Sequence, residues 1–348
     1  MNSWQDFLDT QGATRSATGE LAFPTDEANG GHCVDTTYIT ELGYQGLLAF
    51  DGPDAIKFLQ GQVTTDVREL ASGQWKLGAQ CNLKGRMQAS FALLQTHPEQ
   101  ILLRCHASLT DTIAESLQKY AVFSKVKISN VSHTWRRLGV FGPAASKLLE
   151  THCNLQLEQC GDAQSHTDII GLKLDEQRYE LWVSAERAED LWQTFVNSCT
   201  LGNSQLWQLA DIRAGRAEIT ATNAGEFSPH ELHYPLIGAV SFKKGCYTGQ
   251  EVVARLHYKG KLKKQMVRIA LSTERLDTHT AIVDAAGTRR GTLVMAAPVN
   301  TSSWEALAVL PNDDSIELYL AAHEGGSAVI KIDRLSLPYP LPTADNSL

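Results

Sequence analysis

The sequence lacks the cysteine patterns that build disulfide frameworks and metal or redox centres. Its 348 residues include seven cysteines, an odd number at irregular spacings, and none of them forms a C-x-x-C pair. This disfavours a zinc ribbon, a thioredoxin-type pair and a c-type haem site, and we predict no metal site. Unpaired cysteines at such spacings are typical of a reducing compartment.

Long apolar runs are missing too. No uninterrupted run approaches the roughly 18 apolar residues of a membrane-spanning helix. Residues 1–15 contain no basic region followed by an apolar core, so we expect no signal peptide. We therefore expect a cytoplasmic protein with no membrane partner.

Several catalytic motifs are also absent. The chain has no Walker loop, no G-x-G-x-x-G after a strand, no G-x-S-x-G elbow and no H-E-x-x-H helix. These absences disfavour a nucleotide-driven or hydrolytic enzyme. The composition that remains, 43% hydrophobic and 20% charged, is that of a globular protein, for which we expect two or three domains and a monomer.

Charge is distributed unevenly along the chain. The formal net charge is -8, yet residues 243–268 contain eight Lys and Arg side chains and a single acid. Such a basic stripe suits a polyanionic partner, for example an RNA backbone or a polyglutamylated cofactor. A solvated basic linker between domains has the same composition, so both interpretations stay open.

The segment around Cys246 concentrates the candidate chemistry. Thr248 and Glu251 form a capping-box pattern, which predicts that a helix begins just after the cysteine. The positive end of that helix, together with Lys243 and Lys244, would favour a thiolate or attract an anion. The alternative is that this cysteine is a small buried hydrophobe.

Two strand–helix units, FDGPDAIKFL and VFGPAASKLL, lie about 91 residues apart and form a weak internal repeat. In the first unit we expect Asp51 to cap the helix and Gly61 to end it. A hairpin is predicted over residues 75–94. After Lys261 the pattern changes to short strands separated by turns, which is typical of a small β-barrel or sandwich.

Four segments, in order across roughly residues 45–260, carry a family pattern. They are Leu59-Gln60-Gly61-Gln62-Val63-Thr64-Thr65-Asp66-Val67, Lys119-Tyr120-Ala121-Val122-Phe123-Ser124-Lys125-Val126, Asn203-Ser204-Gln205-Leu206-Trp207 and Lys244-Gly245-Cys246-Tyr247-Thr248-Gly249-Gln250-Glu251. Together they resemble the YgfZ family of folate-binding, tRNA-modifying proteins, relatives of the glycine-cleavage aminomethyltransferase or T-protein. An eight-residue motif with cysteine in context is far more specific than a lone glycine pattern.

The resemblance implies a fold and a domain plan. The fold is an α+β ring of three parts, namely two α+β lobes, the second of them ferredoxin-like, and a C-terminal antiparallel β-barrel, with folate held in the central cavity. The implied plan is an N-terminal extension over residues 1–30, an aminomethyltransferase-like folate-binding region over 31–260 and the barrel over 261–348.

The resemblance also implies a function. YgfZ-like proteins support the maturation or repair of iron-sulfur proteins, including the tRNA methylthiotransferase, in a way linked to tetrahydrofolate. The implied partners are folate, such iron-sulfur proteins, and tRNA indirectly. Trp207 matches the residue that stacks on folate, and Cys246 corresponds to the family's functional thiol. The other motif residues are Lys244, Gly245, Tyr247, Gly249, Gln250 and Glu251.

The sequence departs from its relatives at positions that matter. The T-protein hairpin carries catalytic acids where this chain has Ala89 and Ser90. The glutamate that anchors the pterin is replaced by Arg213, and a tryptophan is replaced by Gln45. Arg213 could pair with a carboxylate of a folate tail or form an internal salt bridge, and we expect the salt bridge. We therefore do not expect a conventional enzyme. The alternatives are a tetrahydrofolate-dependent one-carbon transferase with another catalytic group, and an RNA-binding module.

Overall fold

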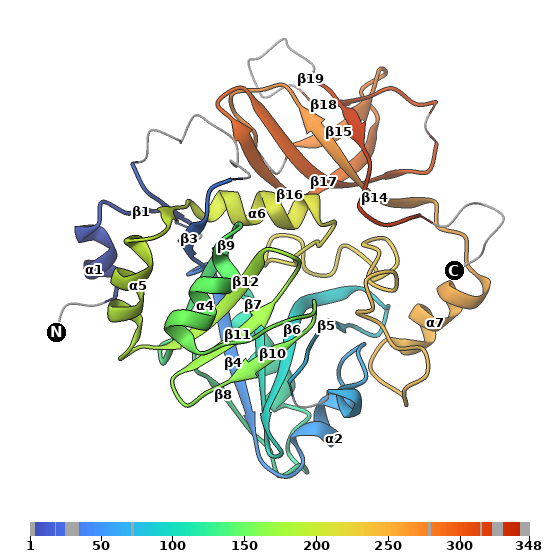
Figure 1. Ribbon diagram of the computed structural model, residues 1–348. Helices are drawn as coiled ribbons and strands as arrows, with labels where there is room; N and C mark the ends of the chain where they lie inside the picture. The colour runs from blue at the N-terminus through green and yellow to red at the C-terminus, as the bar shows by residue number, and fades with distance from the viewer. Residues whose placement is uncertain are drawn as a thin grey trace.

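A computed structural model describes residues 4–17, 19–24, 35–70, 73–277, 280–313, 315–321 and 330–341. In these residues, three large sheets of five, six and seven strands account for most of the β-structure. The two smaller ones form two lobes and the largest forms a barrel, which lies above both lobes in Figure 1. The predicted α+β architecture is thus confirmed.

The first lobe is an antiparallel sheet in the order β5-β6-β7-β4-β8. Its predicted hairpin is present as β5 and β6, and the predicted first strand–helix unit as β4 and α2. The elements are β4 (Gln45–Asp51), α2 (Ala55–Gln60), η2 (Val67–Glu69), β5 (Trp75–Cys81), β6 (Met87–His97), β7 (Gln100–His106), η3 (Ala107–Leu109), α3 (Thr110–Gln118) and β8 (Lys127–Asn130).

The second lobe is a sheet in the order β10-β11-β12-β9-β3-β13, in which β13 pairs with β3 in parallel and the other pairs are antiparallel. A small β1–β2 hairpin and α1 precede it. The elements are α1 (Trp4–Thr10), β1 (Thr14–Arg15), β2 (Leu21–Ala22), β3 (Tyr38–Glu41), β9 (Trp135–Phe141), α4 (Ala145–Cys153), β10 (Ala163–Ser165), β11 (Ile169–Lys173), β12 (Arg178–Ser184), α5 (Ala188–Val196) and β13 (Thr200–Leu201).

The barrel is an antiparallel sheet in the order β19-β18-β15-β16-β17-β14-β20. Its two outermost strands are successive in the chain, so the sheet curls back on itself. The short strands predicted after Lys261 are therefore confirmed. They are β14 (Lys264–Leu271), β15 (Ala281–Asp284), β16 (Arg289–Asn300), β17 (Ser303–Pro311), β18 (Leu318–Leu320), β19 (Ile330–Lys331) and β20 (Asp333–Leu335).

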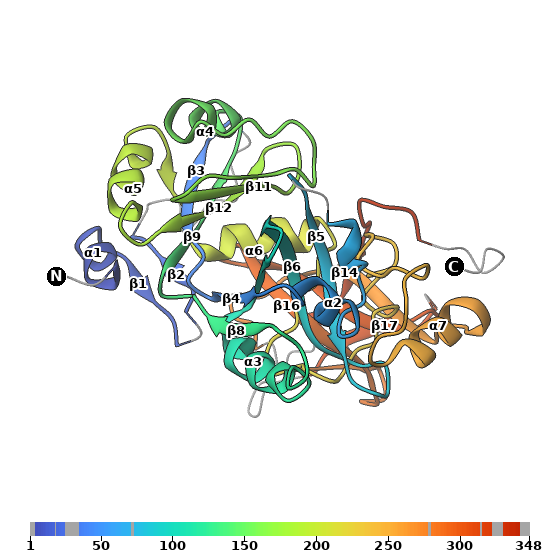
Figure 2. The same ribbon diagram turned by 90° about the horizontal axis from the view of Figure 1, so that it is seen from below.

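Helix α6 (Ser204–Arg213) lies where the three parts meet (Figure 2). The sheets of the two lobes share one core, to which α6 contributes Trp207. Leu209 and Ile212 of the same helix belong to a second core, shared by the first lobe and the barrel. The helix therefore buries different faces against different parts, which fixes the lobes and the barrel relative to one another.

The repeat is real at the level of backbone geometry. In both units a glycine between strand and helix has a positive φ, +135° at Gly52 and +119° at Gly142. A Cβ at Gly52 would collide with the carbonyl oxygen of Lys125, and one at Gly142 with that of Thr36. A side chain is therefore excluded at both turns by conformation and by space.

The expected cap of the first repeat helix is wrong. Asp51 ends β4, and its carboxylate accepts a hydrogen bond from Gln100 Nε2 at 2.7 Å. The N-cap of α2 is Asp54, whose side chain makes no capping bond. Gly61 does follow the last helical residue, as predicted.

No helix within the described ranges is both long enough and apolar enough to cross a membrane. The domain boundary at residue 260 stays a prediction. It falls between the end of α7 (Gln250–Lys259) and the start of β14.

Changing Gly142 to alanine should lower the free energy of unfolding by roughly 2 kcal/mol or more, because the backbone conformation and the Thr36 carbonyl both reject a Cβ. Urea unfolding measures the change. Gly61→Ala is the control, since a Cβ there would meet its nearest atom at 3.7 Å. Equal losses in the two variants would contradict the steric argument.

Candidate functional site

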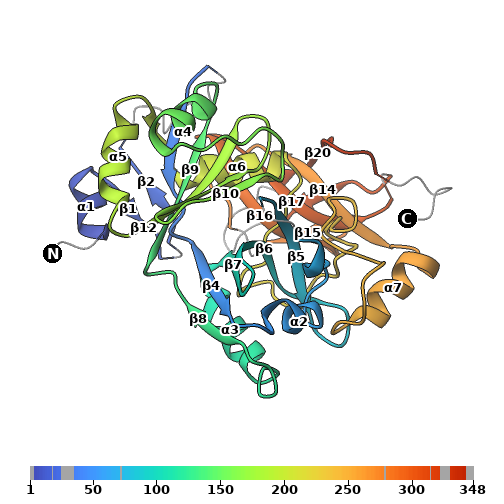
Figure 3. The same cartoon turned by 60° about the horizontal axis from the view of Figure 1, so that its bottom comes forward.

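Cys246 lies on an exposed, irregular segment that leads into α7. Helix α7 lies at the edge of the molecule (Figure 3). The helix begins at Gln250, and its N-cap is Gly249 with a φ of 85° and no capping side chain. The predicted Thr248–Glu251 capping box is therefore wrong, because a left-handed glycine occupies the cap position. Cys246 lies four positions before the first helical residue, outside the first turn.

Lys244 fastens this segment to the first lobe. Its side chain is buried, and Nζ donates hydrogen bonds to the carbonyl oxygens of Val63 at 2.5 Å and Thr65 at 2.7 Å. The ammonium also lies 5.1 Å from the centre of the Tyr247 ring. Burial lowers the pKa of Lys244 to about 8, because desolvation disfavours its charged form.

The expectation that both lysines act on the thiol therefore needs correction. The ammonium of Lys244 is engaged by backbone carbonyls beneath the segment, whereas Lys243 is exposed to solvent. The role of Lys244 in the structure is to hold the segment in place. Gly245 is exposed beside the thiol, Gln250 is half-buried and Glu251 is exposed in the first turn of α7.

The β5–β6 turn supports α7 from below. A Cβ at Gly249 would collide with the carbonyl oxygen of Asn82, and one at Gly85 would lie 2.9 Å from Val252 Cβ. Both glycines have positive φ, so neither position tolerates a side chain without strain. Lys244, Tyr247 and Gly249 thus attach the two ends of the segment to the first lobe.

A cavity of about 40 Å³ lies at the centre of the molecule, between the first-lobe sheet and the segment that follows α6. Apolar and aromatic side chains form one part of its lining: Trp75, Leu77, Phe91, Tyr234 and Ile237. Charged side chains form another part: Arg104, Asp211, Arg216 and Glu218. The lining combines flat apolar walls with a few polar groups, but its volume is well below the roughly 300 Å³ at which small-molecule pockets begin.

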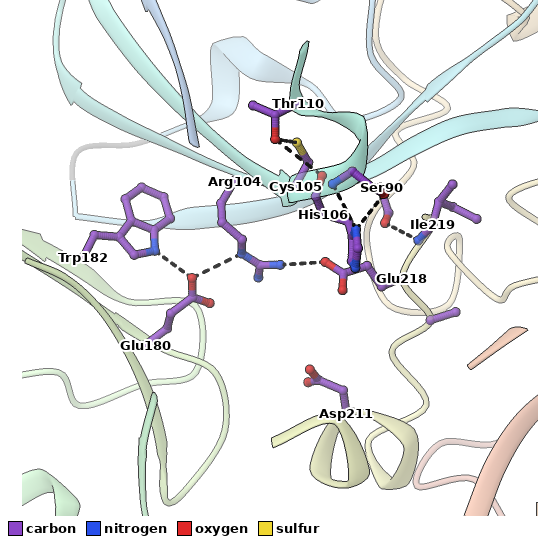
Figure 4. Close-up of polar contacts among 12 residues, drawn as sticks. Ser90, Arg104, Cys105, His106, Thr110, Glu180, Trp182, Asp211, Glu218 and Ile219 are labelled. Carbon is purple, nitrogen blue, oxygen red and sulfur yellow. Dashed lines mark hydrogen bonds and ion pairs between the residues drawn. The ribbon is translucent and has the colours of Figure 1, made fainter. Parts of the chain in front are cut away.

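Arg104 on β7 joins carboxylates from two other parts of the chain (Figure 4). Its Nε lies 3.2 Å from Glu180 Oε1 on β12, and its Nη1 lies 3.5 Å from Glu218 Oε1. Trp182 Nε1 donates to the same Glu180 oxygen at 2.7 Å. The other oxygen of Glu180 is buried and has no hydrogen-bond partner among the described residues.

The carboxyl of Glu218 also lines this cavity. Burial raises the pKa of its carboxyl to about 7, Arg104 opposes the rise, and the negative charges of Asp211 and Glu180 add to it. Ser90, where a T-protein acid is expected, lines the same cavity and accepts a hydrogen bond from the Ile219 N–H at 2.7 Å. Perturbed acids in cavities are candidates for functional roles.

Trp207 is completely buried in the core shared by the two lobes. The Arg178 guanidinium lies 5.1 Å from its ring centre, and Phe141 packs edge-on at 5.7 Å. A Cβ at Gly139 would lie only 2.5 Å from the ring. Stacking of Trp207 on folate stays a prediction, and it requires a neighbour of this ring to move.

Arg213 forms the expected internal salt bridge. Its Nη2 lies 2.8 Å from Glu305 Oε1 on β17, so it ties α6 to the barrel. Gln45 is buried at the start of β4. A second cavity of about 300 Å³ lies on the other side of α6, where Arg178 and Arg213 are among the lining residues. Arg178 pairs with Asp211 of the central cavity at 2.8 Å.

Comparison with known proteins identifies the family. The family model described as the GCVT N-terminal domain matches residues 19–218. The tRNA-modifying protein YgfZ of Photobacterium profundum is 34% identical over 304 residues, which cover 85% of this chain and 89% of that protein. The chain belongs to the YgfZ family.

Another protein named YgfZ, from Cronobacter sakazakii, is 33% identical over 305 residues, covering 86% of this chain and 92% of its own. The solved structure of the glycine cleavage system aminomethyltransferase T from Bartonella henselae has a TM-score of 0.77 and 17% identity, with 95% of both chains covered. At that identity the likeness shows the fold alone. It does not indicate which residues of this chain are functional.

The central charged group was not predicted from the sequence. Arg104, Glu180 and Glu218 come from three distant segments, and no motif links them. One signal is present: Glu180 is a lone acid within the otherwise apolar run of a buried strand. A buried acid of this kind needs a partner, but its strand does not indicate which residue that partner is.

Replacing Glu218 with glutamine should remove one source of pH dependence in the stability. With a folded pKa of about 7 against an ordinary value of 4.5, the unfolded state loses its proton first as pH rises. The wild type should therefore lose up to roughly 3 kcal/mol relative to Glu218→Gln between pH 4.5 and 7.

Urea unfolding of the two proteins across this window measures the difference, which should be constant above pH 7. Glu226→Gln is the matched control, because Glu226 belongs to the same segment but is exposed. A pH-independent difference between wild type and Glu218→Gln would show that this carboxyl is not perturbed.

Proposed function

We propose that this protein is a cytoplasmic, folate-binding accessory protein that supports tRNA modification by maintaining iron-sulfur proteins such as the tRNA methylthiotransferase. The observation that carries the proposal is an exposed Cys246 thiol on a segment whose neighbours Lys244 and Tyr247 are buried. The names of its curated relatives, tRNA-modifying protein YgfZ, support the tRNA-modification part.

Exposure suits a thiol that acts on another protein. A cysteine on the surface can reach a sulfur or metal centre carried by a client without a dedicated pocket. Of the described cysteines, Cys81, Cys105 and Cys153 are buried, and burial raises the pKa of Cys81 and Cys105 to about 12. These buried thiols are poorly suited to such a role.

The folate part is supported by the fold and by the central cavity. The match to the GCVT N-terminal domain and the T-protein fold support a folate-related role for this chain. The cavity offers flat walls and hydrogen-bonding groups where the lobes and the segment after α6 meet. We therefore assign tetrahydrofolate as the cofactor. Trp207 lies in the core beside α6, so its fluorescence would report a change there on binding.

Aminomethyl transfer is the alternative, and the hairpin argues against its usual form. Ala89 is buried and carries no acid, and the Ser90 hydroxyl accepts a backbone hydrogen bond. Neither position provides a carboxylate for general acid–base work. A one-carbon transferase would need another catalytic group in the cavity.

Changing Cys246 to alanine should abolish restoration of tRNA methylthiolation in a strain that lacks this protein, while leaving the unfolding free energy nearly unchanged because the side chain is exposed. The matched control is Cys160→Ala, which removes another exposed thiol, from the second lobe. Methylthiolated nucleoside in total tRNA provides the readout. Full restoration by Cys246→Ala would refute the thiol role.

An RNA-binding function is favoured by one observation, the exposure of Lys259, Lys261, Lys263 and Lys264 along the connection from α7 to β14. If they bind tRNA, neutralising all four should weaken binding and reduce the slope of log affinity against log salt by roughly 0.9 for each phosphate that is no longer bound. Neutralising the exposed Lys57 and Lys147 is the control. No measurable affinity of the wild type for tRNA would exclude this function.

A further inference from the structure

Exposed large hydrophobic side chains gather on one part of the molecule. Within the described ranges they are Leu83, Tyr120, Val122, Phe123 and Tyr258. All of them belong to the first lobe or to α7, and none to the second lobe or the barrel as far as those ranges extend. Single exposed hydrophobic residues are usually scattered, so such a gathering marks an interaction surface.

Three of these side chains form the tip of the loop between α3 and β8. Phe123 is 100% exposed, Val122 72% and Tyr120 62%. The loop is nevertheless attached to the first lobe. The Lys125 N–H donates to the Asp54 carboxylate at 2.7 Å, and the Lys125 carbonyl accepts from the Asp54 N–H at 3.3 Å. The tip is thus tied to the N-cap of α2 while its apolar side chains face solvent.

The other end of α2 leads to the Cys246 segment. The carbonyl of Gly61, which follows the helix, accepts a hydrogen bond from the Thr248 N–H at 3.4 Å. Helix α2 has six residues, so it is only about 9 Å long. In Figures 2 and 3 it lies between α3 and α7. The apolar tip and the thiol segment therefore lie near opposite ends of one short helix.

The two remaining exposed hydrophobic side chains lie on elements that contact the Cys246 segment. Leu83 belongs to the β5–β6 turn, which packs against Gly249. Tyr258 is on α7, and its ring centre lies 6.2 Å from that of Phe242, which precedes Cys246 by four residues. Exposed apolar side chains therefore border the thiol segment as well as the far end of α2.

The charged side chains of this surface are mostly basic. Residues 118–127 contain three exposed lysines and no acid, namely Lys119, Lys125 and Lys127. The exposed cations near the thiol are Lys84, Lys243, Arg255 and Lys259, and Glu251 is an exposed acid there. Apolar side chains with a basic rim are complementary to a partner whose apolar side chains have an acidic rim.

We propose that the loop 118–127, α2, the β5–β6 turn and residues 241–259 form a docking face for a client protein with an acidic rim, which brings the iron-sulfur centre of that client to Cys246. This rests on the proposed function and names the surface that holds the client. Leu83 and Val122 favour a protein over RNA, because an aliphatic side chain has no ring on which a base can stack.

Binding to the purified tRNA methylthiotransferase, loaded with its iron-sulfur clusters, tests the docking face by biolayer interferometry. The double variant Val122→Ser/Phe123→Ser should bind roughly tenfold more weakly than wild type or worse, because truncating apolar anchors of an interface weakens it strongly. Lys119→Glu/Lys125→Glu should also bind more weakly, and this loss should shrink at high salt because the exposed charges are screened.

Matched controls come from the second lobe. Gln193→Ser and Lys147→Glu change exposed side chains there and should bind normally. Cys246→Ala should also bind like wild type, because the thiol is needed after docking rather than for it. Thermal unfolding should show the same stability for every variant, since each substituted side chain is exposed.

Unchanged affinity of Val122→Ser/Phe123→Ser, or no affinity of wild type for the methylthiotransferase, would overturn the docking face. The thiol role is decided separately, by whether Cys246→Ala restores tRNA methylthiolation. Wild-type binding to tRNA or to phosphatidylglycerol vesicles that the double variant loses, with client binding unchanged, would assign the tip to RNA or to a membrane surface instead.

Discussion

The placement of the two lobes against each other depends on the ion pairs that the Arg104 guanidinium forms with Glu180 and Glu218. This guanidinium projects from the first-lobe sheet, contacts Glu180 of the second-lobe sheet and reaches Glu218 on the segment that continues from α6. Removing one partner of a buried charge group leaves the others uncompensated, which is more costly than the pair itself is favourable.

Sequence patterns were sufficient for elements whose signals are local. The hairpin of β5 and β6, the two strand–helix units and the strands of the barrel follow from alternation, turn residues and helical spacing. The family motif also indicated the architecture. The predicted capping box failed because Gly249, rather than Thr248, takes the cap position, and the demand for that glycine comes from the carbonyl of Asn82. That demand arises only after folding.

Contacts between distant residues also limit how much of the candidate site the sequence can predict. Cys246 is visible in the sequence because it belongs to a continuous motif, and Arg213 because it interrupts one. The burial of Lys244 beneath its own segment, and the burial of Trp207 beside Arg178, depend on residues far away in the chain. Glu218 shows no local pattern at all. Its raised pKa follows from burial and from the charges that tertiary structure brings around it.

The contacts that hold the Cys246 segment affect the entropy cost of any association at this thiol. Lys244 bonded to two carbonyl groups, a buried Tyr247 and a glycine locked against the β5–β6 turn leave the backbone around the thiol with little freedom to lose. Ordering a loop on association costs conformational entropy, and a loop that is already ordered avoids most of that cost. If Cys246 acts on a client as proposed, little further ordering of this segment would be required on association.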